Sequence, residues 1–326
     1  MHYTRLGKSG LEVSRLCLGC MAFGDVSTGE RLWALDEDTS RPIIRQALDA
    51  GVNFFDTANV YSKGTSETIT GKILWSMVRR EEIVLATKVH GRMRLGPNGG
   101  GQSRKAILHE IDESLKRLGT DYVDLYQIHR YDPSTPIEET LEALHEVVKA
   151  GKVRYLGASS MFAWQFMKML MTQRMKGWAP FISMQNHVNL LHREEEREML
   201  PLCRAERIGV IPWSPLARGR LARPWGTDTR RTETDAFAGV LYTKGEQASR
   251  QIVANVADIA GKRGVPMAQV ALAWLMAKPE ITAPIVGATR PEQLADAIAA
   301  IDIRLDHDEI AALERPYVPL EPVGFE

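Results

Sequence analysis

The sequence predicts an α/β fold of the (β/α)8 barrel class, with an N-terminal β-hairpin and a long loop after the seventh strand. Two observations indicate it: eight short apolar runs are spread along the chain, and amphipathic helical patterns lie between them. The 326 residues, 44% of them hydrophobic, are enough for one large barrel with a buried core, although the length alone also allows two domains. We therefore expect residues 1–326 to form a single domain.

The first predicted element is the hairpin. The segment MHYTRLGKSGLEVSRL contains two short strand-like runs on either side of a turn at Lys8-Ser9-Gly10. Such a hairpin can close the lower end of a barrel. The same segment lacks the apolar stretch of a secretory signal, which favours a cytoplasmic protein.

The eight barrel strands are predicted from runs that are apolar on both faces, as covered parallel strands are. Their ranges are 16–20, 53–57, 83–89, 123–129, 154–159, 181–185, 209–214 and 283–288. Alternating strands and helices also suit a doubly wound sheet. The count of eight favours the barrel, and the first strand is not followed by the GxGxxG pattern of a dinucleotide-binding sheet.

Two of the intervening helices have clear boundaries. After the third strand, Ser103 is a candidate N-cap and Gly119 a candidate stop. After the fourth, Thr135 opens a capping-box pattern with Pro136 at the first helical position, and Gly151 follows the end. The widest gap between strands separates the seventh from the eighth, and the excess falls in 218–247. A long insertion after a barrel strand usually belongs to the active-site face.

Composition excludes several classes of function. Lys plus Arg and Asp plus Glu are both 41, so there is no basic excess for nucleic acid. No apolar run is long enough to span a membrane.

The cysteines predict no disulfide or metal site. Three cysteines are too few for a disulfide framework in a chain of this length. Cys17 and Cys20 point to opposite faces of a strand, so we expect buried thiols and no metal site. The expected partner is a small molecule, and the expected state is a monomer or weak homo-oligomer.

Four polar residues are candidates for chemistry because they follow consecutive strands. Asp56, Lys88 and His129 end the second, third and fourth strands, and Tyr61 lies five residues beyond Asp56. Catalytic residues of a barrel project from these strand ends. A partly buried lysine needs a counter-ion, and an ammonium beside a phenol favours its ionisation. A histidine can orient a substrate carbonyl, so the set suits protonation of an oxygen while another group attacks the carbon.

Each of these residues alone has an ordinary explanation: a loop cap, a packed aromatic, a solvated lysine or a satisfied core histidine. Their joint position at the ends of neighbouring strands is what favours a site.

These residues also carry a family resemblance. The segment from Gly51 to Tyr61 (GVNFFDTANVY) with Ser66-Glu67, the segment Ala86-Thr87-Lys88 and the segment Gln127-Ile128-His129 resemble the signature of the aldo-keto reductase family. RLCLGCM and VIPWSPLARGRL most resemble a bacterial branch often described as 1-deoxyxylulose-5-phosphate synthase-like reductases. The resemblance implies a barrel that binds NADPH and reduces an aldehyde or ketone. It implies Tyr61 as general acid, with Lys88 assisting it, Asp56 pairing with Lys88, and His129 orienting the carbonyl.

The resemblance also implies the cofactor contacts. Ser159, Ser160 and Gln185 would hold the nicotinamide carboxamide, and Trp213 would stack on the ring. Ser214, Leu216 and Gly219 would approach the pyrophosphate; the adenosine end would meet Gly287, Thr289, Arg290 and Gln293. An arginine where a helix begins suits a 2′-phosphate, which favours NADP over NAD. The family often has asparagine where this chain has Ser160 and Ala297.

Other interpretations stay open. Lys88 could form a Schiff base, as in an aldolase. The chain could instead hold NADPH as a redox sensor with little turnover, although channel-associated proteins of that type lack the histidine found at position 129. Arg92, Arg94 and Arg130 follow strands three and four and either make the pocket mouth positive or, as we expect, are solvated loop residues.

Overall fold

A closed barrel of parallel strands forms the centre of the molecule. The computed structural model describes the whole chain except residues 29–32, 228–240, 243, 324 and 326. Eight parallel strands follow one another in the order β10-β3-β4-β5-β6-β7-β8-β9. The two ends of this sheet meet, because Thr282 N donates to Val210 O at 2.8 Å and Ile285 N donates to Pro212 O at 2.9 Å. The predicted (β/α)8 barrel is confirmed.

Every predicted strand overlaps an observed one: β8 has the predicted bounds, β7 begins one residue earlier than predicted, and the other six are shorter than predicted. The barrel strands are β3 (Cys17–Gly19), β4 (Phe54–Asp56), β5 (Val84–Val89), β6 (Val123–Ile128), β7 (Val153–Ser159), β8 (Phe181–Gln185), β9 (Gly209–Val210) and β10 (Ile285–Val286).

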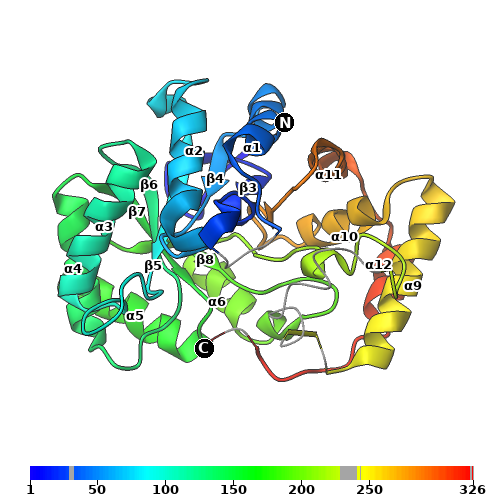
Figure 1. Cartoon of the computed structure of the whole chain (residues 1–326). Helices are drawn as coiled ribbons and strands as arrows, with labels where there is room; N and C mark the ends of the chain where they lie inside the picture. The colour runs from blue at the N-terminus through cyan, green and yellow to red at the C-terminus, as the bar shows by residue number, and fades with distance from the viewer. Residues whose placement is uncertain (29–32, 228–240, 243, 324, 326) are drawn as a thin grey trace.

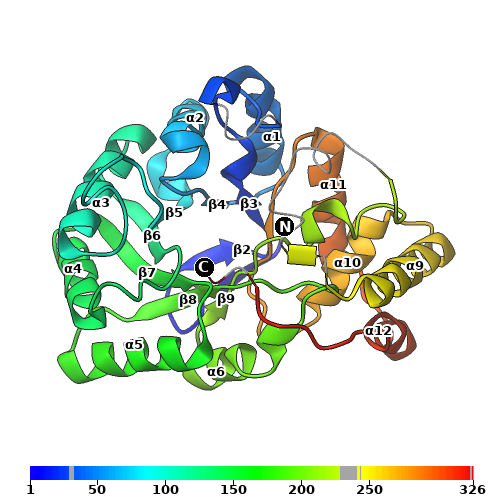
Figure 2. The same ribbon diagram turned by 60° about the horizontal axis from the view of Figure 1, so that its bottom comes forward.

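Helices surround the strands, as Figure 1 shows from the side and Figure 2 shows with the ring of strands turned toward the viewer. The described α-helices are α1 (Glu37–Asp49), α2 (Thr65–Trp75), α3 (Arg104–Leu118), α4 (Ile137–Lys149), α5 (Ala163–Lys176), α6 (Met199–Glu206), α9 (Glu246–Arg263), α10 (Met267–Met276), α11 (Pro291–Ala299) and α12 (His307–Glu314).

Helix boundaries follow local chemistry, with one correction. The Ser103 hydroxyl accepts from Ala106 N and Gly119 adopts φ 64°, so α3 begins and ends as predicted. At α4 the predicted capping box is wrong: Pro136 is the N-cap, with no side-chain cap bond. The Thr135 hydroxyl donates instead to Asp132 Oδ2 at 2.8 Å, because the Asp132 carboxylate lies within reach in the loop before the helix.

The N-terminal hairpin seals one end of the barrel. Strands β1 (Tyr3–Arg5) and β2 (Glu12–Ser14) pair antiparallel. Leu6 and Val13 are fully buried, in one apolar cluster with inward-facing strand residues such as Phe54 and Leu125. Gly7 lies so close to β8 and β9 that a Cβ there would meet Ile182 O at 2.6 Å. The predicted closing role of the hairpin is therefore observed.

A second, larger apolar layer lies between the strands and the helices. Cys17 belongs to the inner cluster and Cys20 to the outer one, so the two thiols face opposite sides, as predicted. Both are free and buried, and burial raises the pKa of each thiol.

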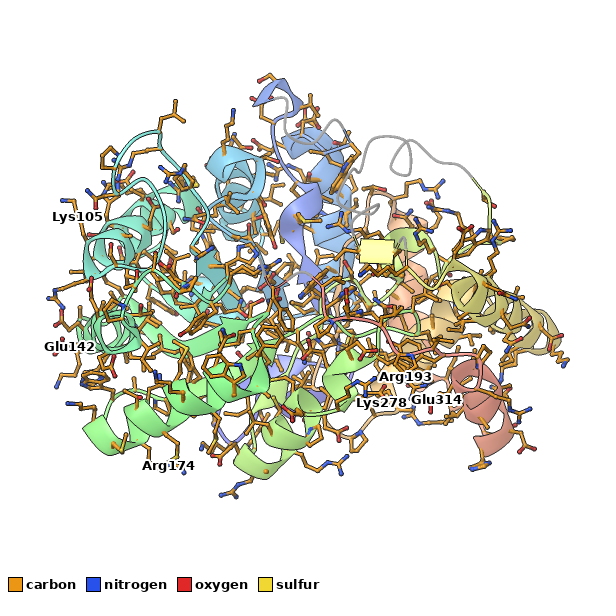
Figure 3. The ribbon with its side chains drawn as sticks, turned by 90° about the horizontal axis from the view of Figure 1, so that it is seen from below. Lys105, Glu142, Arg174, Arg193, Lys278 and Glu314 are labelled. Atoms are coloured by element: carbon orange, nitrogen blue, oxygen red, sulfur yellow. The ribbon has the colours of Figure 1, made fainter. Side chains whose placement is uncertain are left out.

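Ion pairs attach the last helix to the rest of the chain. Glu314 on α12 pairs with Arg193, which follows β8, at 3.1 Å, and with Lys278, which follows α10, at 3.3 Å. Figure 3 shows these three labelled residues grouped beside α12. The predicted long loop connects β9 to α9, but residues 228–240 and 243 of it lie outside the described part of the chain. Within the described residues, no helix combines the length and apolarity needed to span a bilayer.

Candidate active site

Alternate residues of each barrel strand point inward. Along β4, β5 and β6 an inward-facing apolar residue is followed by an inward-facing polar one, so a layer of polar side chains (the polar layer) lies next to a layer of apolar ones (the barrel floor). Phe54, Ala86 and Leu125 belong to the inner apolar cluster. Two residues further along β4, β5 and β6 stand Asp56, Lys88 and Gln127, on the same inward face. Strand register aligns Lys88 with Gln127. Because inward side chains of neighbouring strands stack in layers, these polar groups meet near the C-terminal ends of the strands.

Lys88 is fully buried and held by three oxygen acceptors. Its Nζ donates to Asp56 Oδ1 at 2.5 Å, to Thr57 O at 2.8 Å and to the Tyr61 hydroxyl at 3.2 Å. Burial by itself lowers the pKa of Lys88, but the charges of Asp56 and Tyr61 outweigh it and raise that pKa above its usual value. Lys88 is therefore a fixed ammonium directed at the phenol oxygen.

Two amides hold the other oxygen of Asp56. Gln127 Nε2 donates to Asp56 Oδ2 at 2.8 Å, and Gln185 Nε2 donates to the same oxygen at 3.0 Å. Gln185 Nε2 also donates to Gln127 Oε1 at 3.1 Å. The carboxylate is thus satisfied on both oxygens, which stabilises its charge in a site only 2% exposed.

Tyr61 begins a short strained turn after β4. Ser62 and Lys63 adopt φ values of 47° and 52°, in the left-handed region that is unfavourable for both residue types. The Lys63 amide donates to Val60 O at 3.3 Å and closes the turn. The His129 ring meets the Tyr61 ring nearly at right angles, 78°, with centroids 5.7 Å apart. All four residues of the predicted tetrad are therefore brought together.

A column of stacked rings supports Trp213. His187 lies parallel to Trp213, with centroids 4.1 Å apart, and His192 lies parallel to His187 at 4.2 Å. The Trp213 indole Nε1 donates to Ser160 Oγ at 3.0 Å. The Tyr242 hydroxyl lies 2.8 Å from His187 Nε2, and burial lowers the pKa of both histidines. Packing and one hydrogen bond thus fix the orientation of the indole.

The predicted cofactor residues all end or follow barrel strands at the same end of the barrel. Ser159 and Gln185 close β7 and β8, and Ser160 is held at φ 46° beside them. Beyond β9 the backbone is in the left-handed region at Ser214 (φ 50°) and Gly219 (φ 92°), with Leu216 between them.

Beyond β10, Gly287 is exposed and a Cβ there would meet nothing nearer than Gly19 O at 3.7 Å. Helix α11 begins at Pro291 with Arg290 as its exposed N-cap residue, as predicted. The Thr289 amide donates to Gln293 Oε1 at 2.8 Å and orders this turn. The residue at 297 is a fully buried alanine, which offers no polar group.

Sequence reasoning gave Gln127 and His187 no role. Gln127 could have been predicted as an inward-facing residue, because side chains alternate between the two faces of a strand and Gln127 stands two residues after the inward-facing Leu125. No local pattern marks His187, because its partners Trp213 and Tyr242 are distant in sequence. The described residues contain no group of three metal-ligating side chains.

Comparison with known proteins gives a consistent result. Residues 15–317 match the model of the aldo/keto reductase family. The chain is 44% identical, over 98% of its length and 98% of the relative, to a versiconal hemiacetal acetate reductase of Aspergillus parasiticus. It is 43% identical to a putative aryl-alcohol dehydrogenase of Schizosaccharomyces pombe, over 99% of this chain and 97% of the relative. A putative aryl-alcohol dehydrogenase of Saccharomyces cerevisiae is 39% identical, over 97% and 96%.

These relatives are fungal, and they lend no support to the narrower resemblance to a bacterial branch. The matched family model covers nearly the whole chain, including every barrel strand and all four residues of the tetrad. The chain belongs to the aldo/keto reductase family of oxidoreductases.

Proposed function

We propose that the protein is an NADPH-dependent reductase of aldehydes or ketones in which Tyr61 protonates the carbonyl oxygen. The observation that carries this proposal is the set of contacts of Lys88, whose buried Nζ lies 3.2 Å from the Tyr61 hydroxyl and 2.5 Å from Asp56 Oδ1. A cation beside a phenol stabilises the phenolate that remains after the proton has left.

The other residues of the tetrad complete the assignment. Asp56 keeps Lys88 charged, while Gln127 and Gln185 fix the carboxylate from its other side. His129 stands beside Tyr61 and is partly exposed, so its ring is positioned to donate a hydrogen bond to a carbonyl oxygen that approaches the phenol. In this proposal Tyr61 gives its proton to the carbonyl oxygen. Lys88 stabilises the phenolate that remains, and His129 stabilises the negative charge that develops on the carbonyl oxygen.

The residues past β7 to β10 fit a nicotinamide dinucleotide. One face of Trp213 is covered by His187, and its partial exposure leaves surface for a planar ring. Gln185 uses its Nε2 for Asp56 and Gln127, and neither bond involves Oε1, an acceptor suited to a carboxamide N–H. Open space beside Gly287 admits a phosphate chain, and Arg290 at the start of α11 suits a 2′-phosphate. When bound, NADPH would supply the hydride that reduces the carbonyl carbon.

The names of the relatives are compatible with this proposal, since one is called a reductase of a hemiacetal compound and others are called aryl-alcohol dehydrogenases. Alcohol oxidation and carbonyl reduction are the two directions of one reaction. We also propose one domain over residues 1–326, which is compatible with the closed ring of strands. The monomeric or weakly homo-oligomeric state and the cytoplasmic location stay predictions from the sequence.

The surroundings of Lys88 disfavour the Schiff-base alternative. A lysine nucleophile must lose its proton, yet Asp56, Thr57 and Tyr61 all accept hydrogen bonds from this ammonium, and Asp56 and Tyr61 raise its pKa. A sensor with little turnover is disfavoured by His129, which stands beside Tyr61.

The substitution Tyr61→Phe tests the mechanism. It removes the proton donor and keeps the ring, so we expect kcat for NADPH-dependent reduction of 4-nitrobenzaldehyde to fall by about 10²- to 10⁴-fold. The affinity for NADPH, followed by fluorescence, should be unchanged. Tyr131→Phe is the matched control, because Tyr131 packs against the outer core and should retain full turnover. Normal turnover by the Tyr61→Phe enzyme would refute the role of the phenol.

A further inference from the structure

Arg130 is a cation fixed at the mouth of the barrel, immediately after His129 at the end of β6. Its Nη1 donates to His129 O at 2.7 Å, and its own carbonyl accepts from Gln102 Nε2 at 2.5 Å. The guanidinium carbon lies 5.8 Å from the centre of the Trp213 ring. Arg130 is partly buried, which corrects the expectation of a solvated loop residue.

The other two arginines of this mouth behave as expected. Arg92 and Arg94 are exposed and donate to backbone carbonyls of their own loop, Gly96 O at 2.7 Å and Asn98 O at 3.0 Å respectively. They order the loop and face solvent, so of these three arginines Arg130 is the one that contacts a residue of the candidate site, Trp213.

The charge of Arg130 lies close to the reacting groups. Burial lowers the pKa of Arg130, and the negative form of Tyr61 opposes that effect, so the guanidinium is within electrostatic reach of the phenol. Burial also lowers the pKa of His187 strongly, and Arg130 and Arg218 add to that effect. Arg130 therefore adds a positive charge beside Tyr61 and Trp213.

No carboxylate of the described part of the chain lies within salt-bridge distance of this guanidinium. Asp56 is the acidic residue of the polar layer, and Lys88, Gln127 and Gln185 already occupy its two oxygens. Arg130 forms no salt bridge among the described residues, and one of its five N–H donors is used on a protein acceptor. A partly buried cation with unused donors is costly unless a ligand brings the counter-charge.

We propose that Arg130 recognises an anionic group on the substrate, so that the preferred substrates are aldehydes or ketones that carry a carboxylate or phosphate. The planar fork of a guanidinium matches either group with two parallel hydrogen bonds. This inference rests on the proposed function, because it places the substrate carbonyl at Tyr61 and its anion at Arg130. The other source of such an anion is the dinucleotide itself, through a phosphate.

Rigid substrates test the inference. The 2-, 3- and 4-carboxybenzaldehydes hold a carboxylate at three fixed distances from the carbonyl, and their methyl esters are neutral controls of similar shape. The measured quantity is the ratio of kcat/KM for each acid to that for its ester, with NADPH. We expect at least one isomer to be preferred over its ester by the wild-type enzyme.

Two variants and one control isolate the guanidinium. Arg130→Met keeps much of the side-chain length without the charge, and we expect it to lower kcat/KM for the preferred acid by about 10- to 100-fold while the ester changes little. Arg130→Lys keeps the charge without the fork and should be intermediate. Arg94→Met removes an exposed arginine of the same mouth and should leave the acid-to-ester ratio unchanged.

Three results would overturn the inference. Equal losses for acid and ester would assign Arg130 to the reacting atoms, and a selective loss of NADPH affinity would assign it to a cofactor phosphate. A wild-type enzyme without preference for any acid would also contradict it. If the wild-type chain reduced no carbonyl at all, the proposed function would fail separately. Calorimetric titration with benzoate would then decide: a tenfold weaker affinity in Arg130→Met supports anion recognition, and an equal affinity excludes it.

Discussion

Two buried ionisable residues show how burial and partners decide charge. Lys88 is fully buried and remains an ammonium because Asp56 and Tyr61 compensate for its desolvation. Glu195, between β8 and α6, is 4% exposed, and burial raises the pKa of its carboxyl to about 8. The lysine therefore contributes a charge at neutral pH, whereas the glutamate is mostly protonated there.

The raised pKa of Glu195 makes stability depend on pH. The ordinary pKa of this carboxyl is 4.5, so the native state holds its proton more tightly than the unfolded chain does between pH 4.5 and about 8. Stability should therefore fall across this window as pH rises. Glu195→Gln removes the titration, so its advantage in Tm over the wild type should grow from pH 4.5 to pH 8 and then level off. Glu198→Gln, an exposed control, should show no such trend, and a pH-independent difference for Glu195→Gln would contradict the prediction.

Helices α2 and α3 approach each other through a glycine. A Cβ at Gly71 would lie 2.0 Å from Leu118 O, and that carbonyl is held in place by a hydrogen bond from Trp75 Nε1 at 2.7 Å. Glu67 on α2 is fully buried and accepts from Arg117 on α3 at 2.6 Å, so an ion pair joins the same two helices. The close contact between these helices thus depends on the absence of a side chain at Gly71.

The substitution Gly71→Ala should destabilise the fold because neither backbone can move aside without losing these contacts. We expect a loss of about 2–3 kcal/mol, measured by urea denaturation. Gly261→Ala on α9 is the matched control: a Cβ there meets nothing within 4 Å, and we expect a gain of about 0.5 kcal/mol from helix propensity. A similar effect of both substitutions would show that the α2–α3 contact is looser than described.

The two ends of the barrel have different roles: one carries the candidate site, and the other is closed by the hairpin. The polar layer and the loops after the strands form one end, and the hairpin seals the other through Leu6 and Val13. Truncation of Leu6 to alanine leaves a cavity beneath the barrel floor, so we expect a loss of about 2–5 kcal/mol of stability with unchanged kcat. Leu11→Ala, at a partly buried position of the same hairpin, should cost less. A Leu6→Ala protein as stable as the wild type would mean that the hairpin does not seal the barrel.

Much of the architecture could be predicted because its signals are local. Apolar runs marked all eight strands, and Ser103 and Gly119 marked both ends of α3. The family motifs added the tetrad, which no single spacing would have identified. Local signals failed at Thr135, where Asp132 competes for the hydroxyl that the capping-box pattern assigned to the helix.

The sequence by itself determined the order of strands and helices, the family, and the residues at the strand ends, since these depend on periodicity and on motifs of a few residues. Only the tertiary structure decided which side chains share the site. Asp56 meets Gln127, 71 residues away, and Gln185, 129 residues away, because barrel closure and strand register bring their inward faces to one level. The burial of Arg130 and the stacking of His187 under Trp213 have the same origin, for contacts between distant segments leave no periodic trace in the chain.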